Sequence, residues 1–285
     1  MERARVEEVV GDFVNLKRRG TNLIGLCPFH HEKTPSFNVS PSRNIYKCFG
    51  CGKVGDSITF VREHEGYDYP EAIRYLAGKY SIQLEETQAD AETIQAERER
   101  ETIYKVLEFA WQYYKSQLHD TEEGQLAGLN YFIERGFRTK TIESFGLGYA
   151  PEKADALIQE AKKAGFTLDI LQRAGLITQY GGDFFRHRVM FPIFNISGKV
   201  IAFAGRQMVS SKRGPKYINS PETEIYVKRK VLYGLSHAKK AIRDNDNCFL
   251  VEGYTDVISL HQAGIENVVA SSGTALTPDQ IRLIR

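Results

Sequence analysis

The residues best suited to chemistry in this sequence are two pairs of metal-binding side chains near the amino terminus. Cys27 is followed by His30, and Cys48 by Cys51, with two residues between the members of each pair. This spacing lets a tight turn direct both side chains of a pair at one ion. Three thiolates and one imidazole are the closed ligand set of a structural zinc site. The sequence therefore predicts one zinc ion bound by these four residues.

A second imidazole, that of His31, lies beside this site. Only His30 keeps the two-residue gap after the first cysteine, so we favour His30 as the fourth ligand. Pro28, Gly50 and Gly52 flank the ligands and suit the tight loops that such a site needs. Because a structural zinc ion contributes roughly 10–16 kcal/mol to folding, we expect this part of the chain to depend on its metal.

The composition is that of an ordinary folded protein. The chain has 285 residues, 42% hydrophobic and 26% charged, which is enough for two domains with separate cores. No long apolar run predicts a membrane span, and the start of the chain lacks an export signal. Zinc-spaced thiols with one cysteine left over favour the reducing cytoplasm over a disulfide framework. That cysteine, Cys248, lies in the apolar run CFLV, which predicts a buried strand residue.

Charge is distributed unevenly along the chain, although the net charge is only +2. Residues 1–87 are neutral, 88–125 carry −5, 126–245 carry +10 and 246–285 carry −3. A basic middle followed by an acidic end suits a protein that grips a phosphate backbone beside a cation site. A solvated lysine-rich surface would have the same composition, so charge alone leaves both interpretations open.

Hydrophobic periodicity indicates how the zinc ligands are held. Residues 3–17 have a helical period, Asp56 and Pro70 can begin two further helices, and the stretches SFNVS and NIYKC alternate as strands do. Basic and aromatic side chains on exposed strands suit a single nucleic-acid strand, since cations neutralise phosphates and rings stack on bases. The candidates are Lys33, Arg43, Tyr46, Lys47 and Phe49, and the pattern leaves open that each is an ordinary surface or core residue.

The middle of the chain alternates between predicted helices and strands. Residues 87–101 lack Gly and Pro and have few large apolar groups, which predicts a charged linker, helical or flexible. A hairpin at Asn195–Gly198 joins two predicted strands. The predicted helices are 102–118, 124–134, 151–164 and 167–174, and the strands are 184–194 and 199–204.

Arginines accompany these strands and one helix end. Arg186 and Arg188 fall on one strand face, because side chains alternate with a period of two. Adjacent cations repel each other unless an anion such as phosphate bridges them, and Arg206 follows the second strand. Arg135 precedes a glycine, so it either belongs to a simple helix C-cap or faces a ligand; the spacing leaves both open.

Residues 247–270 predict one βαβ unit with parallel strands. Glu252 lies at the carboxyl end of the first strand, where open α/β sheets place their ligands. Asp256 either supports a site there or caps the following helix. A last helix begins near Pro278, where free N–H groups could face a phosphate.

Three stretches of this sequence resemble the bacterial replicative DNA primases: CPFHHEKTPSF with YKCFGCGKVGDSITFV, then GPKYINSPET, then VEGYTDV. The first resembles the zinc-binding domain of that family, and the last the Toprim motif shared with some topoisomerases. The resemblance implies an α+β protein that begins with a small antiparallel zinc-ribbon domain. The implied divisions are the zinc domain 1–86, the linker 87–101, a mixed α/β catalytic-core subdomain 102–245 and an incomplete α/β Toprim end 246–285.

The same resemblance implies roles for individual residues. Glu252 would bind catalytic Mg²⁺ or Mn²⁺ or exchange protons, with Asp256 in support, and the zinc domain would bind template. The groove for template, primer or triphosphate would be lined by Arg135, Arg186, Arg188, Arg206, Lys216, Tyr217, Asn219 and Lys228.

A primase joins ribonucleoside triphosphates into a short RNA primer on single-stranded DNA, a reaction that two divalent ions favour. The implied partners are the template, the triphosphates, the RNA primer and a replicative helicase at the cytoplasmic replication fork. The second acidic cluster of a Toprim site, of Asp-x-Asp type, and the helicase-binding region do not occur in this sequence. We therefore expect a fragment of a longer polypeptide that is inactive alone.

Other functions fit part of the sequence. A non-catalytic, zinc-dependent single-stranded-DNA-binding module needs only the zinc domain and the basic middle. A topoisomerase or nuclease could use the same glutamate, but nothing in the zinc segment or PKYINSPET favours it. A phage-type primase fused to a helicase is a further relative; the Cys₃His set and the middle subdomain favour the stand-alone bacterial kind.

Overall fold

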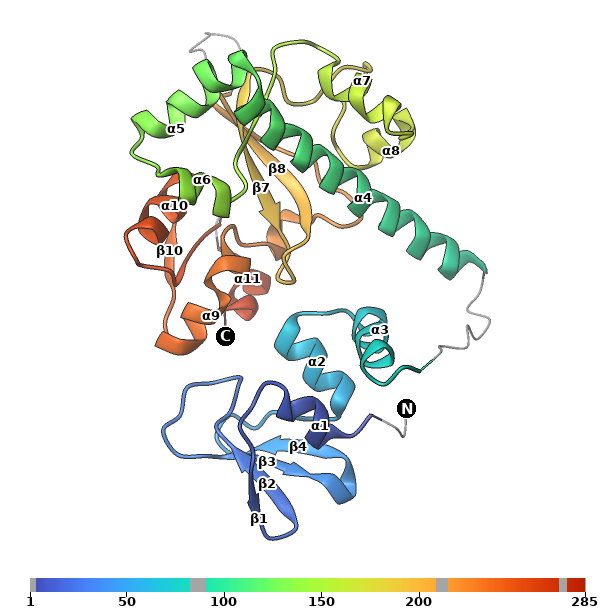
Figure 1. Ribbon diagram of the computed structural model, residues 1–285, viewed down its shortest axis with the longest axis vertical. Helices are drawn as coiled ribbons and strands as arrows, with labels where there is room; N and C mark the ends of the chain where they lie inside the picture. Colours follow the sequence, from blue (N-terminus) through green and yellow to red (C-terminus); the bar gives the residue numbers. More distant parts are fainter. Residues whose placement is uncertain (1–3, 83–90, 209–214, 272–275, 285) are drawn as a thin grey trace. The chain divides into compact units, whose positions relative to one another are not determined.

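The computed structural model describes residues 4–82, 91–208, 215–271 and 276–284 (Figure 1). The chain divides into two compact units, one of residues 1–88 with 240–247 and the other of residues 89–239 with 248–285. The first holds an antiparallel sheet and the second holds helices with two further sheets, so the protein is of the predicted α+β class. Within the described ranges, no helix is long and apolar enough to cross a membrane.

The first unit is a five-stranded antiparallel sheet with short helices, as predicted. Inward side chains from neighbouring strands, Phe37, Val39 and Tyr46, pack with Phe60 of a helix in one core. The strands, in sheet order, are β1 (Lys17–Arg19), β2 (Asn22–Gly25), β3 (Phe37–Ser40), β4 (Ile45–Cys48) and β5 (Val54–Gly55). The helices are α1 (Val6–Gly11), the 3₁₀ turn η1 (Pro41–Arg43), α2 (Ser57–Glu65) and α3 (Tyr69–Lys79).

Helices α2 and α3 begin where Asp56 and Pro70 predict, and the structure adds a second aspartate, Asp68, as the cap of α3. Asp56 accepts a hydrogen bond of 2.8 Å from the N–H of Thr59. Asp68 accepts one of 2.8 Å from the N–H of Glu71, and the Glu71 carboxylate accepts one of 3.0 Å from the N–H of Asp68. These caps satisfy backbone donors that the first helical turn leaves without partners.

Two predictions about the first unit are wrong. Helix α1 covers only Val6–Gly11, because Lys17–Arg19 forms β1 and turns at Gly20, whose φ of +65° suits glycine. Tyr46 is fully buried, with its ring stacked 5.0 Å from that of Phe37, so it is a core residue and no exposed contact for nucleic acid.

The second unit is built on a four-stranded antiparallel sheet. The β7–β8 hairpin turns at Asn195–Gly198, as predicted. Val189, Phe191 and Ile193 enter one core while Met190 enters another, so both faces of β7 are buried and the strand is a continuous apolar run. The strands, in sheet order, are β6 (Gly148–Ala150), β7 (Arg188–Phe194), β8 (Val200–Gln207) and β9 (Tyr217–Asn219).

One face of this sheet is covered by the long helix α4 (Ala91–Asp120), which crosses it in Figure 1. Val106, Ala110 and Tyr114 of α4, spaced by four residues, pack in the same core as Phe203 of β8. Residues 91–101, predicted as a linker that is helical or flexible, form the first turns of α4; residues 87–90 lie outside the described residues.

The helices that follow α4 match the predicted order with two differences. The predicted helix 124–134 is a π-helical segment, η2 (Gly124–Leu129), followed by α5 (Asn130–Glu134). Helix α6 (Thr139–Ser144) was not indicated by the sequence pattern. Helices α7 (Ala156–Lys163) and α8 (Leu168–Arg173) lie within the predicted ranges and share the core of α4.

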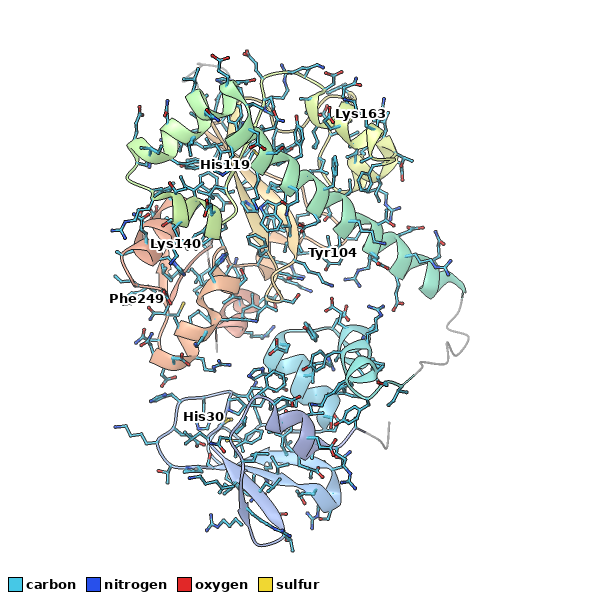
Figure 2. All side chains as sticks on the ribbon, viewed as in Figure 1. His30, Tyr104, His119, Lys140, Lys163 and Phe249 are labelled. Carbon is cyan, nitrogen blue, oxygen red and sulfur yellow. The ribbon has the colours of Figure 1, made fainter. Side chains whose placement is uncertain are left out.

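The other face of the sheet packs against the predicted βαβ unit through Val257 and Ile258. Its elements are β10 (Phe249–Val251), α10 (Tyr254–Gln262) and β11 (Val268–Ala270), and β10 and β11 are parallel. Flanking this unit are the 3₁₀ turn η3 (Lys228–Lys230), α9 (Leu235–Asn245) and α11 (Pro278–Leu283). The prediction for Cys248 is wrong: it precedes β10 and is partly exposed, and Phe249 (Figure 2) and Leu250 of that strand are exposed as well.

A buried carboxylate from a distant segment caps the amino-terminal end of α7. Asp183 is 4% exposed and accepts hydrogen bonds from the N–H groups of Leu157 (2.8 Å) and Ile158 (3.2 Å). Burial raises the pKa of Asp183 to about 6, although those two hydrogen bonds act to lower it. Because this pKa exceeds the ordinary value of 3.8, the folded protein binds the proton more tightly than the unfolded chain does.

We therefore expect the free energy of unfolding of the second unit to fall as the pH rises from about 4 to about 6. The contribution of Asp183 is about 2–3 kcal/mol, since each unit of pKa difference between the folded and unfolded states is worth about 1.4 kcal/mol. Asp183→Asn removes this titration and should flatten the slope, whereas Asp169→Asn, at an exposed position on α8, should not. Urea denaturation between pH 4 and pH 7 measures the slopes, and equal slopes for wild type and Asp183→Asn would contradict the prediction.

Candidate functional site

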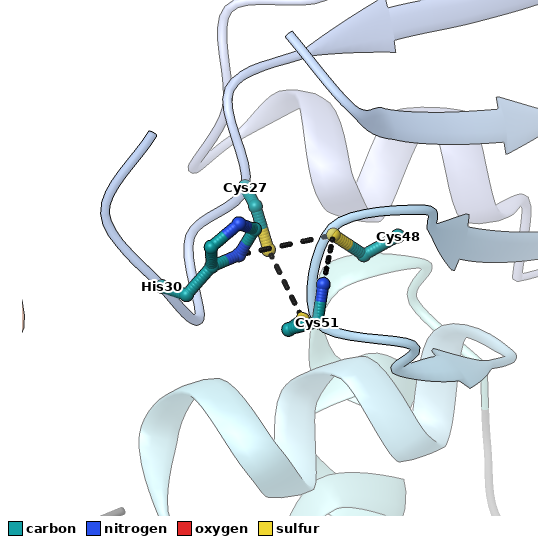
Figure 3. A group of neighbouring side chains, drawn as sticks. All are labelled: Cys27, His30, Cys48 and Cys51. Carbon is teal, nitrogen blue, oxygen red and sulfur yellow. Dashed lines mark hydrogen bonds between the residues drawn. The ribbon is translucent and has the colours of Figure 1, made fainter. Parts of the chain in front are cut away.

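The four predicted zinc ligands converge in the first unit, where Figure 3 shows their side chains directed at one another. Their ligand atoms all lie within 4.8 Å of each other. The Sγ atoms of Cys27 and Cys51 are 3.9 Å apart, and Sγ of Cys48 lies 3.8 Å from Nδ1 of His30. A tetrahedral zinc ion with Zn–S bonds of about 2.3 Å holds its sulfur ligands about 3.8 Å apart. The donor set and its spacing therefore fit zinc, and the exposed His31 lies outside the set.

Several hydrogen-bond donors point at Cys48. The N–H groups of Gly50 and Cys51 lie 3.3 and 3.4 Å from its Sγ, and Oγ of Ser36, which donates its proton to Glu32, also lies 3.3 Å away. Burial raises the pKa of Cys48, but these contacts together lower it below the ordinary value. Burial also raises the pKa of Cys27. The loop after β4 is thus shaped to hold a thiolate, which is the form of cysteine that binds metal.

Near the metal site, most of the predicted basic and aromatic contacts are at the surface. Phe49 is 70% exposed, and Nζ of Lys47 lies 5.2 Å from the centroid of its ring. Lys33 and Arg43 are exposed as well. The exposed ring of Phe49 beside the ammonium group of Lys47 suits a single nucleic-acid strand, whereas Tyr46 is excluded by its burial.

An open pocket of about 630 Å³ in the second unit contains two of the predicted arginines. The guanidinium carbons of Arg135 and Arg206 lie 5.1 and 4.3 Å from the ring centroid of Tyr131. Nε of Arg206 is buried and has no hydrogen-bond partner among the described residues. Two guanidinium groups, one with an unused donor, suit an anionic ligand such as phosphate. The lining is Leu126, Ala127, Asn130, Tyr131, Glu134, Arg135, His187, Arg206 and Met208.

Arg135 also stands at a helix end. Gly136 has φ of +80°, and the N–H of Phe137 donates to the carbonyl of Phe132 at 3.0 Å, which is a Schellman-type C-cap. The C-cap interpretation of this Arg-Gly pair is therefore confirmed. It is compatible with a ligand contact, because the cap uses backbone groups and the guanidinium lies in the pocket.

Arg186 and Arg188 do not share a strand face, so the predicted phosphate bridge between them is wrong. His187 has φ of +49°, which breaks the extended geometry, and β7 begins only at Arg188. Arg186 is exposed, whereas Arg188 is 8% exposed, and burial lowers the pKa of Arg188. The Arg188 guanidinium donates to the carbonyl oxygens of Gly205, Pro215 and Lys216. Arg188 therefore anchors the segment that carries Lys216.

Arg188→Ala is expected to lower the free energy of unfolding of the second unit by about 2–4 kcal/mol, because the buried guanidinium and its hydrogen bonds to three backbone carbonyls are lost. Arg186→Ala removes the same charge from an exposed position and should change this free energy by less than about 0.5 kcal/mol. Urea denaturation of both variants measures the difference. Equal stability of the two variants would show that Arg188 does not anchor this segment.

The other predicted groove residues are Lys216, directly before β9, Tyr217 and Asn219 on β9, and Lys228 beyond it. Oδ1 of Asn219 accepts a hydrogen bond of 2.7 Å from the hydroxyl of Tyr254, whose ring lies 6.3 Å from that of Tyr217. This bond ties β9 to the helix start two residues after Glu252. Lys216 is exposed.

Lys228 lies farther along the chain, in η3, and is half-buried. Its N–H donates to Oε1 of Glu222 at 2.9 Å, and its carbonyl accepts from Nε2 of Gln280 at 3.3 Å. The backbone of Lys228 is therefore fixed from both sides.

The predicted acidic residues lie at the carboxyl end of β10. Glu252 directly follows the strand and is exposed. Oδ2 of Asp256 accepts a hydrogen bond of 3.1 Å from the N–H of Gly253, so Asp256 does cap α10. Among the described residues, no third acidic or imidazole side chain completes a metal-binding group with these two.

The predicted phosphate position at the start of α11 is wrong. Oγ1 of Thr277 accepts from the N–H of Gln280, and the Gln280 side chain accepts from the N–H of Thr277. Asp279 places a carboxylate in the first turn, where it pairs with Arg229 at 2.9 Å. The preceding residues 272–275 lie outside the described residues.

Three pocket and groove residues were missed by the sequence reasoning: Tyr131, His187 and Tyr254. Nδ1 of His187 lies 3.0 Å from the hydroxyl of Tyr149, which donates to Oε1 of Glu123 at 2.8 Å. No periodic pattern marks these residues, because each is brought to its place by contacts between distant segments.

Comparison with known proteins places three family models on this chain. Residues 1–92 match the CHC2 zinc finger, residues 113–239 the N-terminal domain of the DNA primase catalytic core, and residues 247–285 the Toprim domain. The zinc-finger match covers all four converging ligands, and the cluster is a zinc site of this type.

The curated proteins similar to this chain are DNA primases. A DNA primase of Clostridium acetobutylicum is 45% identical over 98% of this chain and 46% of that protein, and one of Halalkalibacterium halodurans is 43% identical over the same shares. The chain thus spans about half the length of the curated relatives it matches.

Two solved structures are also similar. The Aquifex aeolicus primase, with its zinc-binding and RNA polymerase domains, is 37% identical with a TM-score of 0.59, covering 99% of this chain and 68% of that one. A DnaG primase catalytic domain bound to single-stranded DNA is 36% identical with a TM-score of 0.58, covering 66% of this chain and 58% of that one.

Proposed function

The chain belongs to the family of bacterial DNA primases, and from this premise we propose that the whole protein synthesises short RNA primers on single-stranded DNA for replication. In this reaction a 3′-hydroxyl attacks the α-phosphate of a ribonucleoside triphosphate and pyrophosphate leaves. One observation carries the proposal: similarity to a solved primase extends over 99% of this chain, through both its zinc-binding and its polymerase domains.

We assign the binding of the catalytic metal ion to Glu252, because its exposed carboxylate at the end of a strand suits a hard divalent cation. Bound Mg²⁺ or Mn²⁺ would stabilise charge on the transferring phosphate. Asp256 holds the helix start that positions this segment.

Two regions with basic side chains would bind the phosphates of nucleic acid and triphosphates. The pocket with Arg135 and Arg206 suits phosphates of template, primer or triphosphate, and the supporting residues in our proposal are Arg186, Lys216, Tyr217, Asn219 and Lys228. In the zinc domain, Lys47 and Phe49 suit a template strand.

The test is incorporation of labelled ribonucleotides into short products on single-stranded DNA with Mg²⁺ or Mn²⁺. It should be run with this chain and with the full product of its gene, each loaded with zinc. We expect short RNA products from the full product. Failure of a folded, zinc-loaded full product to make any would overturn the proposal.

A second candidate function for this chain alone is a zinc-dependent module that binds single-stranded DNA without catalysis. It is favoured by the net charge of +10 over residues 126–245 and by the arginine pocket. Fluorescence anisotropy should give affinities that fall with salt by a log–log slope of about −0.7 per neutralised phosphate. Arg206→Ala should reduce that slope, and Lys163→Ala on α7 (Figure 2) should not. Primer synthesis by the 285-residue chain itself would exclude this alternative.

We further propose a replicative helicase as a protein partner and the cytoplasmic replication fork as the place of action, on the strength of family membership. Co-purification of the full gene product with the helicase of the same organism tests this. Absence of a complex at micromolar concentrations of both proteins would contradict it.

A further inference from the structure

Glu32 is a nearly buried carboxylate beside the zinc site, with its side chain only 10% exposed. Its Oε1 accepts hydrogen bonds from the N–H of Cys27 (2.8 Å) and the N–H of Ser36 (2.9 Å). Its Oε2 accepts a hydrogen bond from the hydroxyl of Ser36 and lies 3.3 Å from Nε2 of His30. Glu32 is therefore in contact with one zinc ligand through the backbone and with a second through its ring.

The two nitrogens of His30 face different partners. Nδ1 lies 3.8 Å from Sγ of Cys48, inside the ligand cluster, whereas Nε2 faces the carboxylate of Glu32. A neutral imidazole that binds zinc through Nδ1 carries its proton on Nε2. A carboxylate accepting that proton in a hydrogen bond fixes the tautomer, orients the ring and makes the metal-binding nitrogen more basic.

Ser36 extends this contact to a third ligand. Its hydroxyl, bound to Glu32, is 3.3 Å from Sγ of Cys48, on the other ligand-bearing loop. Gly50 closes the same space, since a Cβ there would lie 2.6 Å from Nε2 of His30 and 2.8 Å from Oγ of Ser36. The imidazole and the hydroxyl are thus packed against backbone, with little room to turn away from Glu32.

We propose that Glu32 is a positioning residue for the zinc site, which fixes the Nε2-protonated tautomer of His30 and joins the two ligand loops through Ser36. Three of the four ligands depend on this network, and the exposed Cys51 is outside it. The proposal rests on the zinc site alone and is independent of primer synthesis.

Glu32→Gln is the selective change. The amide oxygen can replace Oε1 and still accept from the N–H groups of Cys27 and Ser36, so the loop keeps its backbone bonds. The amide NH₂ then takes the place of Oε2 opposite the Nε2–H of His30. Both groups are donors, so the hydrogen bond to His30 is lost. Loss of a partner to a metal-binding histidine lowers metal affinity by about 10–100-fold.

The experiment measures zinc affinity of the whole chain by competition with a chromophoric chelator, with Glu63→Gln as the control. Glu63 is an exposed carboxylate of the same unit, paired with Lys53 at 2.9 Å. We expect Glu32→Gln to bind zinc 10–100-fold more weakly and Glu63→Gln to match wild type. Wild-type affinity in Glu32→Gln would overturn the proposal.

The tautomer itself is read by long-range ¹H–¹⁵N NMR of the histidine rings in the zinc-loaded protein. Wild type should show a slowly exchanging Nε2 proton on His30, and Glu32→Gln should lose that protection while keeping the sheet signals of the first unit. A protected Nε2 proton in both proteins would refute the tautomer role. Ser36→Ala supplies a double-mutant cycle: additive losses in affinity for the Glu32 and Ser36 changes would refute the coupling of the loops.

Discussion

Removing the zinc ion is expected to unfold the first unit while the second unit stays folded. A domain of about 80 residues has a total stability of roughly 4–12 kcal/mol, whereas a structural zinc ion contributes roughly 10–16 kcal/mol. Two of the ligands, Cys27 and Cys48, also belong to the buried core of this unit. Loss of the ion leaves three thiols clustered without their charge partner and loosens the loops that close over Phe37 and Tyr46.

The measurement is a thermal melt followed by circular dichroism, with and without a chelator, together with zinc content by mass spectrometry. Wild type should hold one zinc ion per chain and melt in two transitions, of which the chelator abolishes one. Cys48→Ser should lose the ion and that transition. Cys248→Ser removes a thiol that lies outside the cluster and should change neither. A Cys48→Ser protein with a full zinc content and both transitions would contradict this prediction.

The zinc ligands and the starts of α2 and α3 were predictable because their geometry is local. Two residues between ligands suffice to define a turn, Asp56 caps a helix only three residues away, and Pro70 suits the first turn of another. The order of strand, helix and strand around Glu252 follows equally from short-range patterns. These features depend little on what the rest of the chain does.

The wrong predictions concern residues whose surroundings come from distant segments. Tyr46 alternates like an exposed strand residue, but Phe60 of a later helix covers it. Arg188 was assigned to phosphate because of its spacing, yet carbonyls of two other segments surround it. Glu32 stands two residues from a zinc ligand, and only the folded loop shows that its carboxylate reaches that ligand's ring.

In the full gene product, assayed for the primer synthesis proposed above, Glu252→Gln is expected to lower kcat by at least about 100-fold, with DNA affinity unchanged. The amide keeps the size of the side chain but loses the charge that a hard divalent cation requires. General acid–base or metal-linked roles of a carboxylate are each worth about 10²–10⁴ in rate. Primer yield at saturating template and triphosphate, with anisotropy for DNA affinity, separates these effects.

Glu266→Gln is the matched control for this prediction. Glu266 is exposed and belongs to the same βαβ unit, but it precedes β11, whereas Glu252 follows β10. Because the two strands are parallel, the two carboxylates lie at opposite ends of the same small sheet. A general effect of lost charge would slow both variants, whereas a role at the carboxyl ends of the strands slows only Glu252→Gln. Equal rates for wild type and Glu252→Gln would remove Glu252 from the reaction, and the reacting carboxylates would then have to come from another part of the gene product.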